Sequence, residues 1–295
     1  MNLAKREYVP FKESEHSIRN DGIFKIVFGS NQRSQYLREF LESILHKKIT
    51  NIVVMNDVAL NKTHEDNKLM RLDILAEVDG KEKINVEIQN KNEYNVIERS
   101  EVYASGIVYN ALNIGDKYSK VPETIVIWLL GFNIFKDGNY HEISRMRRDF
   151  NGEPVDNNIT YHYIQLPKFL EQTREIKTKE EQWLAYITNS LNKEELEELF
   201  VMNRSIEEIN KIVDIVMTDQ DVRDALNERI LAENLERLKA QKAYSDGKEA
   251  GIEEGIEQGV EQKNKENAKK MKEKGIDIKI IEEVTGLTEE EIKKL

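Results

Sequence analysis

Apolar and polar residues follow two periods along the first part of this chain of 295 residues. Apolar residues three and four positions apart after Ser34 predict a helix that Ser34 caps, and Asp21–Phe28 predicts a short helix or turn before it. Three segments with strand character follow, over residues 51–60, 69–78 and 83–89. The dipeptide Asp79-Gly80 separates the last two segments and is typical of a tight hairpin turn, so we expect these two strands to pair.

A helical period returns over residues 92–114, which end beside Gly115. Residues 124–130 are almost uniformly apolar and predict a central strand that is buried on both faces. A further alternating segment, 161–166, stops at Pro167. Strands and helices in this order predict an α/β fold, a mixed sheet flanked by helices, and we place this core at residues 1–170.

Beyond residue 170 the sequence shows only helical patterning. We divide it into a helical region over 171–244 and a helical tail over 245–295. The tail contains four glycines that stand four residues apart, Gly247, Gly251, Gly255 and Gly259. The last stretch, 275–295, predicts a helical hairpin, and Thr288 with Glu291 forms a capping-box pattern at its final helix.

Two interpretations of the glycine repeat stay open. Each glycine costs about 1 kcal/mol in a helix interior relative to alanine, so a flexible linker is the first interpretation. The second is close contact between helices of a homo-oligomer, because glycine lets two backbones approach, and we favour this one. The glutamates between the glycines exclude a dimer inside a membrane.

The chain has no cysteine, which excludes disulfides, thiolate zinc sites and a thiol nucleophile. No apolar stretch approaches the roughly 18 residues of a membrane span, and no secretion signal is visible, so we expect a cytoplasmic protein without membrane contact. The net charge of -11 is uneven: residues 1–170 hold 23 Lys and Arg against 24 Asp and Glu, and residues 171–295 hold 21 against 31. The nearly neutral first part is compatible with a DNA partner once metal ions neutralise a carboxylate cleft.

Two carboxylates on the second and third predicted strands are candidates for chemistry. Side chains alternate across a strand, so Glu87 and Gln89 share one face, and pairing through the hairpin turn brings Asp73 opposite Glu87. Like charges this close repel unless a cation lies between them. Mg²⁺, Mn²⁺ or Ca²⁺ suits such oxygen ligands, with the main-chain carbonyl of Ile88 as a further one, and can activate water. By spacing alone, a solvated acidic strand face is the commoner explanation.

Six short motifs in a fixed order change this balance. They are Asp21-x-x-Phe24-Lys25-x-x-Phe28, Arg71-Leu72-Asp73-Ile74-Leu75-Ala76, Val86-Glu87-Ile88-Gln89, Arg99-x-x-x-Tyr103, Gly115-x-x-Tyr118 and Leu166-Pro167-Lys168-Phe169. Together they resemble the Rpn family of recombination-promoting nucleases and putative transposases, in the PD-(D/E)xK nuclease superfamily. The glycine-repeat tail and closing hairpin are also typical of that family. The resemblance implies a restriction-endonuclease-like core, which agrees with the predicted order of elements.

The resemblance also implies roles for individual residues. By position, Asp73 and Glu87 would be the metal ligands, and Gln89 stands where the superfamily usually has lysine. Glutamine offers hydrogen bonds but no charge, so we expect Gln89 to position the attacking water. Our hypothesis is that Lys25 supplies the missing cation. The alternative for Lys25 is a plain ion pair with Asp21, four residues earlier.

Arg99 and Tyr103 lie four residues apart on one face of the predicted helix, so both can reach the same cleft. Arg99 suits a phosphate contact, and an ion pair with Glu101 or Glu87 is its alternative. Asp21 is a third candidate for contact with the substrate.

The sequence therefore predicts a metal-dependent DNA endonuclease that hydrolyses phosphodiester bonds and is associated with recombination or mobile elements. The alternative is a catalytically degenerate nuclease fold that binds nucleic acid or protein as an oligomeric module. Gln89 in place of lysine keeps that alternative open.

Overall fold

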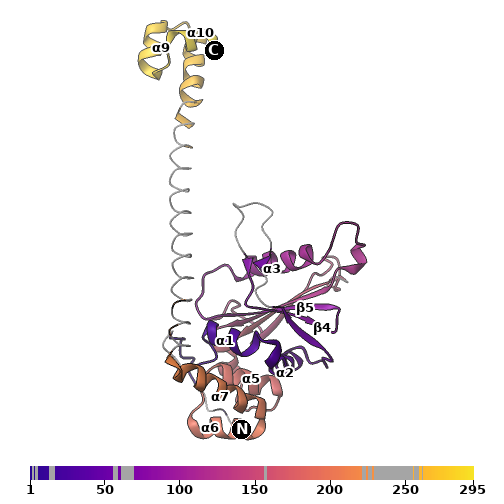
Figure 1. The fold of residues 1–295 in the computed structure, drawn as a ribbon. Coiled ribbons are helices and arrows are strands. Elements are labelled where there is room, and N and C mark those ends of the chain that lie inside the picture. Colours follow the sequence, from indigo (N-terminus) through magenta and orange to yellow (C-terminus); the bar gives the residue numbers. More distant parts are fainter. Residues whose placement is uncertain are drawn as a thin grey trace. The chain divides into compact units, whose positions relative to one another are not determined.

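The computed structural model of the chain falls into two compact units, Met1–Asp224 and Ala225–Leu295 (Figure 1). The structure describes all residues except 2, 4–5, 13–16, 56–58, 61–69, 156–157 and, between 221 and 261, all but 224, 228, 255, 259 and 260. Among the described residues, no helix has the length and apolarity that a membrane span requires.

A six-stranded mixed sheet forms the centre of the first unit, with the strand order β1-β4-β5-β6-β8-β7. The strands are β1 (Ile52–Met55), β4 (Ile74–Val78), β5 (Glu82–Gln89), β6 (Glu123–Leu130), β7 (His141–Ser144) and β8 (Ile159–Gln165). β5, β6 and β8 run parallel, whereas β1, β4 and β7 are antiparallel to their neighbours. This mixed sheet with its flanking helices confirms the predicted fold class.

Helices cover both faces of the sheet. β6 is buried from Thr124 to Leu130, as its apolar sequence predicts, and packs on one face against α3 (Val96–Asn110). The other face is covered by α1 (Asp21–Phe28) and α2 (Ser34–Leu45) (Figure 1). The sheet is therefore an interior layer, and any functional side chain on it must lie near a strand end or beneath a helix.

The helices expected beyond residue 170 are present and extend the layer formed by α1 and α2. They follow α4 (Leu166–Gln172) and are α5 (Lys179–Ile187), α6 (Lys193–Met202) and α7 (Arg204–Thr218). α5 packs against α2, and α7 packs against α1. The buried rings of Phe28, Phe40 and Trp183 join α1, α2 and α5, with centroids at most 6.0 Å apart.

Two of the predicted strands are each divided. Segment 51–60 forms β1 and a separate short strand, β2 (Ala59–Leu60), and segment 69–78 forms β3 (Met70–Arg71) and β4. β2 pairs with β3 in a two-stranded sheet of their own. In segment 69–78 the apolar alternation continues across the division, so the pattern alone does not reveal where the backbone changes partner. In segment 51–60 two adjacent polar residues, Asn56 and Asp57, interrupt the apolar pattern. The break before β4 falls at Asp73.

Three boundaries differ from the predicted ones. α2 begins at Ser34 instead of being capped by it, because a short 3-10 turn, η1 (Asn31–Arg33), precedes it and places Arg33 at the N-cap. α3 is shorter than predicted, since a left-handed φ of 57° keeps Tyr94 out of the helix. β8 leads directly into α4, whose first turn contains Pro167. Proline fits this position because the first N–H groups of a helix have no hydrogen-bond partner within the helix.

The unpredicted strand β7 brings together histidines that are distant in the sequence. His141 Nε2 lies 2.9 Å from His162 Nδ1 on β8, and His141 Nδ1 lies 2.8 Å from the Glu180 carboxylate. His46 contacts the other oxygen of Glu180 at 3.2 Å. Within the described part of the chain, no group of three or more histidine or acidic side chains is arranged to hold a metal ion. Burial, and then the neighbouring His141, lower the pKa of His162 to about 3.

The second unit contains a small helical core near the C-terminus. A helix over residues 262–273 packs with α9 (Ile278–Thr285) and α10 (Glu289–Lys294). Its buried side chains are those of Ala268, Ile281, Leu287 and Ile292. The predicted hairpin is present, and Thr288 and Glu291 form the predicted capping box.

The glycine repeat lies only partly within the described residues. Gly247 and Gly251 fall outside them, whereas Gly255 and Gly259 are helical. A Cβ added at either of the latter two would meet no heavy atom within 4 Å. Close packing at the repeat therefore stays a prediction.

We predict that His162 makes the fold sensitive to acid. In the folded protein the ring stays neutral down to about pH 3, whereas in the unfolded chain it takes up a proton near pH 6.5. The unfolded state binds more protons between these values, so the free energy of unfolding falls as the pH falls. Between pH 7.5 and pH 5 this contribution is about 2 kcal/mol. Urea unfolding of the wild type and of His162→Gln at both pH values measures it; equal pH dependence in the two proteins would contradict the prediction.

Candidate active site

Asp73 and Glu87 lie side by side at the open end of the β4–β5 hairpin. The register pairs Ile74 with Val86, which brings the next residues outward, Asp73 and Glu87, opposite each other. The main-chain N–H of Asp73 donates to Glu87 Oε1 at 3.0 Å, and the N–H of Ile88 donates to Asp73 Oδ2 at 3.2 Å. A main-chain N–H of each strand thus binds the carboxylate of the opposite strand. The two acids lie next to each other, as the hairpin pairing predicted.

The main-chain carbonyl of Ile88 faces the same place. In a strand, the N–H and C=O of one residue point toward the same neighbouring strand. Because the Ile88 N–H reaches Asp73, the Ile88 carbonyl also points to the side of Asp73. Two carboxylates and one carbonyl are therefore directed to one edge of β5.

Glu87 is almost completely buried, with 1% of its surface exposed. Burial, and then the charge of Asp73, raise the pKa of Glu87 well above its ordinary value. The hydrogen bond from Asn85 Nδ2 at 3.1 Å and the Arg99 guanidinium at 3.5 Å act in the opposite direction but do not reverse the shift. A buried acid with a strongly perturbed pKa is typical of a functional site.

Lys25 extends from α1 to the Asp73 carboxylate. Its Nζ lies 3.0 Å from Asp73 Oδ1 and 2.9 Å from Asp21 Oδ2, so the site contact and the pair with Asp21 coexist. Burial alone would lower the pKa of Lys25, but Asp73 and Asp21 together raise it above its ordinary value. The ammonium group therefore stays charged at neutral pH.

Arg99 on α3 connects the remaining predicted residues. Its Nη1 donates to Gln89 Oε1 at 2.6 Å, and its Nη2 donates to the Tyr103 hydroxyl at 3.0 Å. The guanidinium lies 4.8 Å from the ring centre of Trp128 on β6. The other end of the Gln89 side-chain amide, Nε2, donates to the Lys91 carbonyl at 2.9 Å. Both ends of the glutamine amide are engaged, and the guanidinium is fixed over the sheet.

A protein-family model, described as PD-(D/E)XK nuclease family transposase, matches residues 18–241, which include every site residue described above. The chain belongs to this family. Membership confirms the predicted family relationship and supports a nuclease- or transposase-like function on nucleic acid. No curated protein and no solved structure matches the chain significantly.

Two residues of the candidate site were not among the candidates from the sequence. Asn85 is fully buried on β5 and donates to Glu87, and Trp128 is fully buried on β6 beneath Arg99. The sequence could have identified Asn85 as a site residue, because a polar residue two positions before Glu87 lies on the same strand face as Glu87. The sequence could not have identified Trp128 in this way, since an aromatic residue within an apolar strand is ordinarily a core residue.

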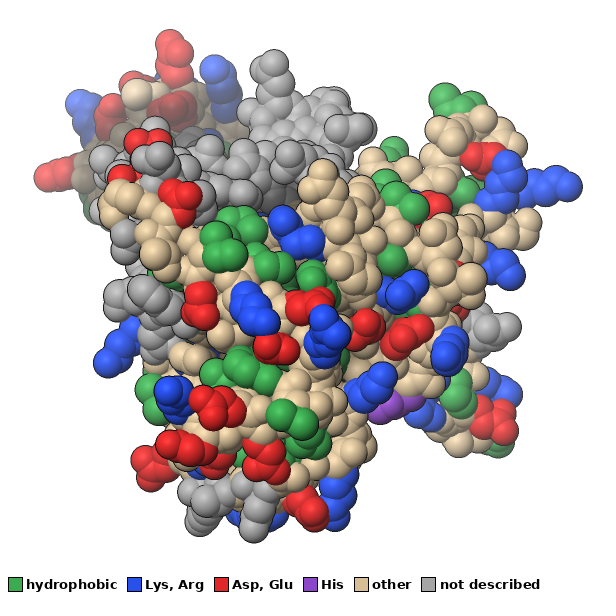
Figure 2. All heavy atoms as spheres, turned by 60° about the horizontal axis from the view of Figure 1, so that its bottom comes forward, with side chains coloured by type: hydrophobic (Ala, Val, Ile, Leu, Met, Phe, Trp, Pro, Cys, Tyr) green, Lys and Arg blue, Asp and Glu red, His purple; other side chains and the backbone are tan. Residues whose placement is uncertain are grey.

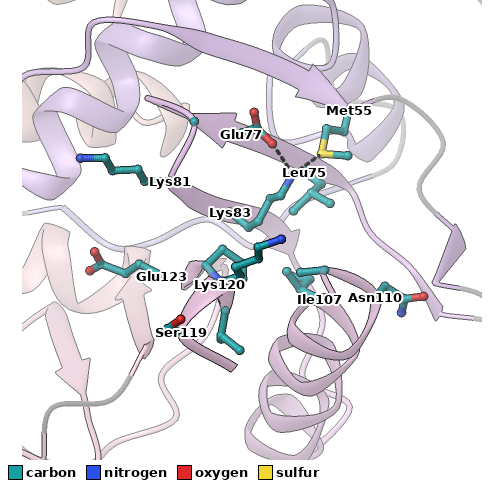
Figure 3. A pocket seen from close by; sticks show the side chains of 14 residues that line it. Met55, Leu75, Glu77, Lys81, Lys83, Ile107, Asn110, Ser119, Lys120 and Glu123 are labelled. Carbon is teal, nitrogen blue, oxygen red and sulfur yellow. Dashed lines mark hydrogen bonds and ion pairs between the residues drawn. The ribbon is translucent and has the colours of Figure 1, made fainter. Parts of the chain in front are cut away.

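A cavity of about 820 Å³ lies farther along the β4–β5 hairpin, nearer its turn (Figure 3). Its walls come from β4, β5, the end of α3 and the turn η2 (Tyr118–Lys120). Lys83 in the wall pairs with Glu77 at 2.6 Å. Neither Asp73 nor Glu87 lines this cavity, so it is separate from the candidate site.

We predict that Glu87→Gln stabilises the metal-free protein. The amide removes a buried charge beside Asp73, yet its oxygen still accepts the hydrogen bonds from the Asp73 N–H and Asn85. Thermal unfolding in EDTA should shift upward by about 2–4 °C, which corresponds to about 1 kcal/mol for a unit of this size. The control Glu82→Gln, on the same strand, breaks only the ion pair with Lys47 and should not stabilise. A lower unfolding temperature for Glu87→Gln would refute the prediction.

Proposed function

We propose that the protein is a divalent-cation-dependent endonuclease that hydrolyses phosphodiester bonds in DNA. The observation that carries the proposal is the pair of Asp73 and Glu87, each held by a main-chain N–H of the opposite strand. Lys25 and Arg99 contact this pair and supply positive charge for a phosphate. Membership of a nuclease family supports nucleic acid as the substrate.

The donor atoms fit a hard cation such as Mg²⁺, Mn²⁺ or Ca²⁺. Asp73, Glu87 and the Ile88 carbonyl are the groups that would hold it. Mg²⁺ is commonly bound through one or two protein carboxylates, with waters and substrate phosphate completing its shell, so a site with only two acids suffices. Asp73 and Glu87 lie side by side, and an added cation offsets the repulsion between their carboxylates. When bound, it supplies an activated water and stabilises charge on the phosphate.

The protein's own cations bind and orient the substrate. Arg99, fixed by Tyr103 and Gln89, presents a planar guanidinium that suits two phosphate oxygens. Lys25 takes the part that a lysine at position 89 would play, because its ammonium group lies at Asp73 and stays charged. Gln89 holds Arg99, and its amide can position water once its contact with the Lys91 carbonyl opens.

The family and the composition support proposals on the biological process, the oligomeric state and the cellular location of the protein. The transposase description of the family supports an association with recombination or mobile elements. The glycine repeat supports a homo-oligomer formed through the tail, and a chain without cysteine suits the cytoplasm. Acidic and basic side chains are interspersed over the face drawn in Figure 2. We place DNA binding at the cations of the candidate site, Lys25 and Arg99.

A catalytically degenerate module that binds nucleic acid or protein is the second candidate. Gln89 favours it, because position 89 carries no charge and both ends of its amide are engaged.

Plasmid cleavage separates the two candidates. Supercoiled plasmid with Mg²⁺, Mn²⁺ or Ca²⁺ should be nicked or linearised by the wild type, and EDTA should abolish this. Asp73→Ala and Glu87→Ala should each slow cleavage by more than about 100-fold, since even the loss of an outer partner of a metal ligand costs 10- to 100-fold. Cleavage that persists in both variants would exclude this site. DNA binding without cleavage in all three metals would favour the degenerate module.

The role of Lys25 is tested by Lys25→Gln. Removal of a fixed charge near the reacting phosphate should lower kcat by about 100-fold. The unfolding temperature should fall as well, because Asp73 and Asp21 lose their partner, so kcat is compared well below that temperature. Lys47→Gln is the matched control, because Lys47 also pairs with a carboxylate, that of Glu82, but outside the site. A kcat of Lys25→Gln equal to that of the control would reduce Lys25 to a structural partner of Asp21.

A further inference from the structure

Asn85 is a costly residue at its position in the sheet. It is fully buried on β5, between Leu75 of β4 and Val126 of β6. Its Oδ1 is buried and has no hydrogen-bond partner among the described residues. A buried polar atom left in this way costs about 1–3 kcal/mol. An apolar side chain of the same size would avoid that cost, so the fold alone does not account for an asparagine here.

The other end of the Asn85 amide acts on Glu87. Nδ2 donates to Glu87 Oε1 at 3.1 Å, and the main-chain N–H of Asp73 donates to the same oxygen at 3.0 Å. Within the described part of the chain, Glu87 Oε2 has only a long contact, 3.5 Å, to the Arg99 guanidinium. Two donors on one oxygen therefore fix the carboxylate plane and leave the second oxygen available.

We propose that Asn85 is a positioning residue that holds Glu87 so that Oε2 is presented to the bound cation. The inference rests on the proposed function, because it concerns how the chain prepares Glu87 as a metal ligand. The last torsion of a glutamate is broad and has no sharp minimum of its own. The hydrogen bond from Asn85 narrows the range of that torsion before the ion binds. A preorganised ligand binds more tightly because less conformational freedom is lost on binding.

Asn85→Leu tests this role with measurements that do not depend on catalysis. Calorimetric titration of the full chain with Mn²⁺ should give a dissociation constant about 10- to 100-fold higher than that of the wild type, the usual effect of losing an outer partner of a metal ligand. The unfolding temperature in EDTA should stay equal or rise, because the variant also removes the partnerless oxygen. Weaker metal binding without loss of stability is a combination that a purely structural asparagine does not produce.

Asn90→Leu is the matched control. Asn90 also donates one hydrogen bond, to the Arg19 carbonyl at 2.8 Å, and its Oδ1 is likewise buried without a partner among the described residues. Its amide hydrogen bond goes to a main-chain carbonyl and not to Glu87. The Mn²⁺ affinity of Asn90→Leu should therefore match that of the wild type. Asn85→Thr, a residue suited to strands, gives the same comparison if the leucine variant does not fold.

The outcomes separate this inference from the proposed function. Equal Mn²⁺ affinity in Asn85→Leu and the wild type would overturn the role of Asn85 and leave the metal site in place. Weaker binding accompanied by an equal loss of stability in EDTA would also overturn it, as would the same weakening in Asn90→Leu. A wild-type protein that binds no Mn²⁺ would overturn both proposals together.

Discussion

The site depends on an exchange of hydrogen bonds between two carboxylates and the main chain of the opposite strand. Where the β4–β5 ladder ends, the Asp73 N–H donates to Glu87 and the Ile88 N–H donates to Asp73. The Asp73 carboxylate thus replaces the carbonyl acceptor that a continued ladder would offer to the Ile88 N–H. This exchange fixes two like charges next to each other, and the surrounding structure compensates for that repulsion.

The compensation comes from elements on both faces of the sheet. Lys25 reaches Asp73 from α1, and Arg99 reaches Glu87 from α3. The compensation is incomplete. The pKa of Glu87 stays well above its ordinary value, and Asn85 keeps a buried oxygen without a partner among the described residues. Local instability of this kind is expected where a fold retains groups for function at the expense of stability. The histidines around Glu180 form a second polar cluster, which lies outside the candidate site.

Pattern and motif together predicted much of this arrangement. The uniformly apolar β6 was recognisable as a central strand, and the Asp79-Gly80 turn was enough to pair β4 with β5 and so bring Asp73 to Glu87. The division of segment 69–78 was not recognisable, since alternation of apolar and polar residues describes a pleated backbone and not the strand with which it pairs. The unpredicted β7 has a mixed burial pattern, which hides it from any test of apolar periodicity.

The sequence by itself determined the α/β class, the hairpin that carries the two acids and the family that six ordered motifs resemble. These are local properties, because period, turn residues and motif order are all written along the chain. Only the tertiary structure decided which residues surround the acids. Asn85 donates to Glu87, Gln89 and Tyr103 hold Arg99, and Trp128 lies beneath it. Contacts of this kind arise where separate strands and helices meet, and neither residue type nor spacing specifies them.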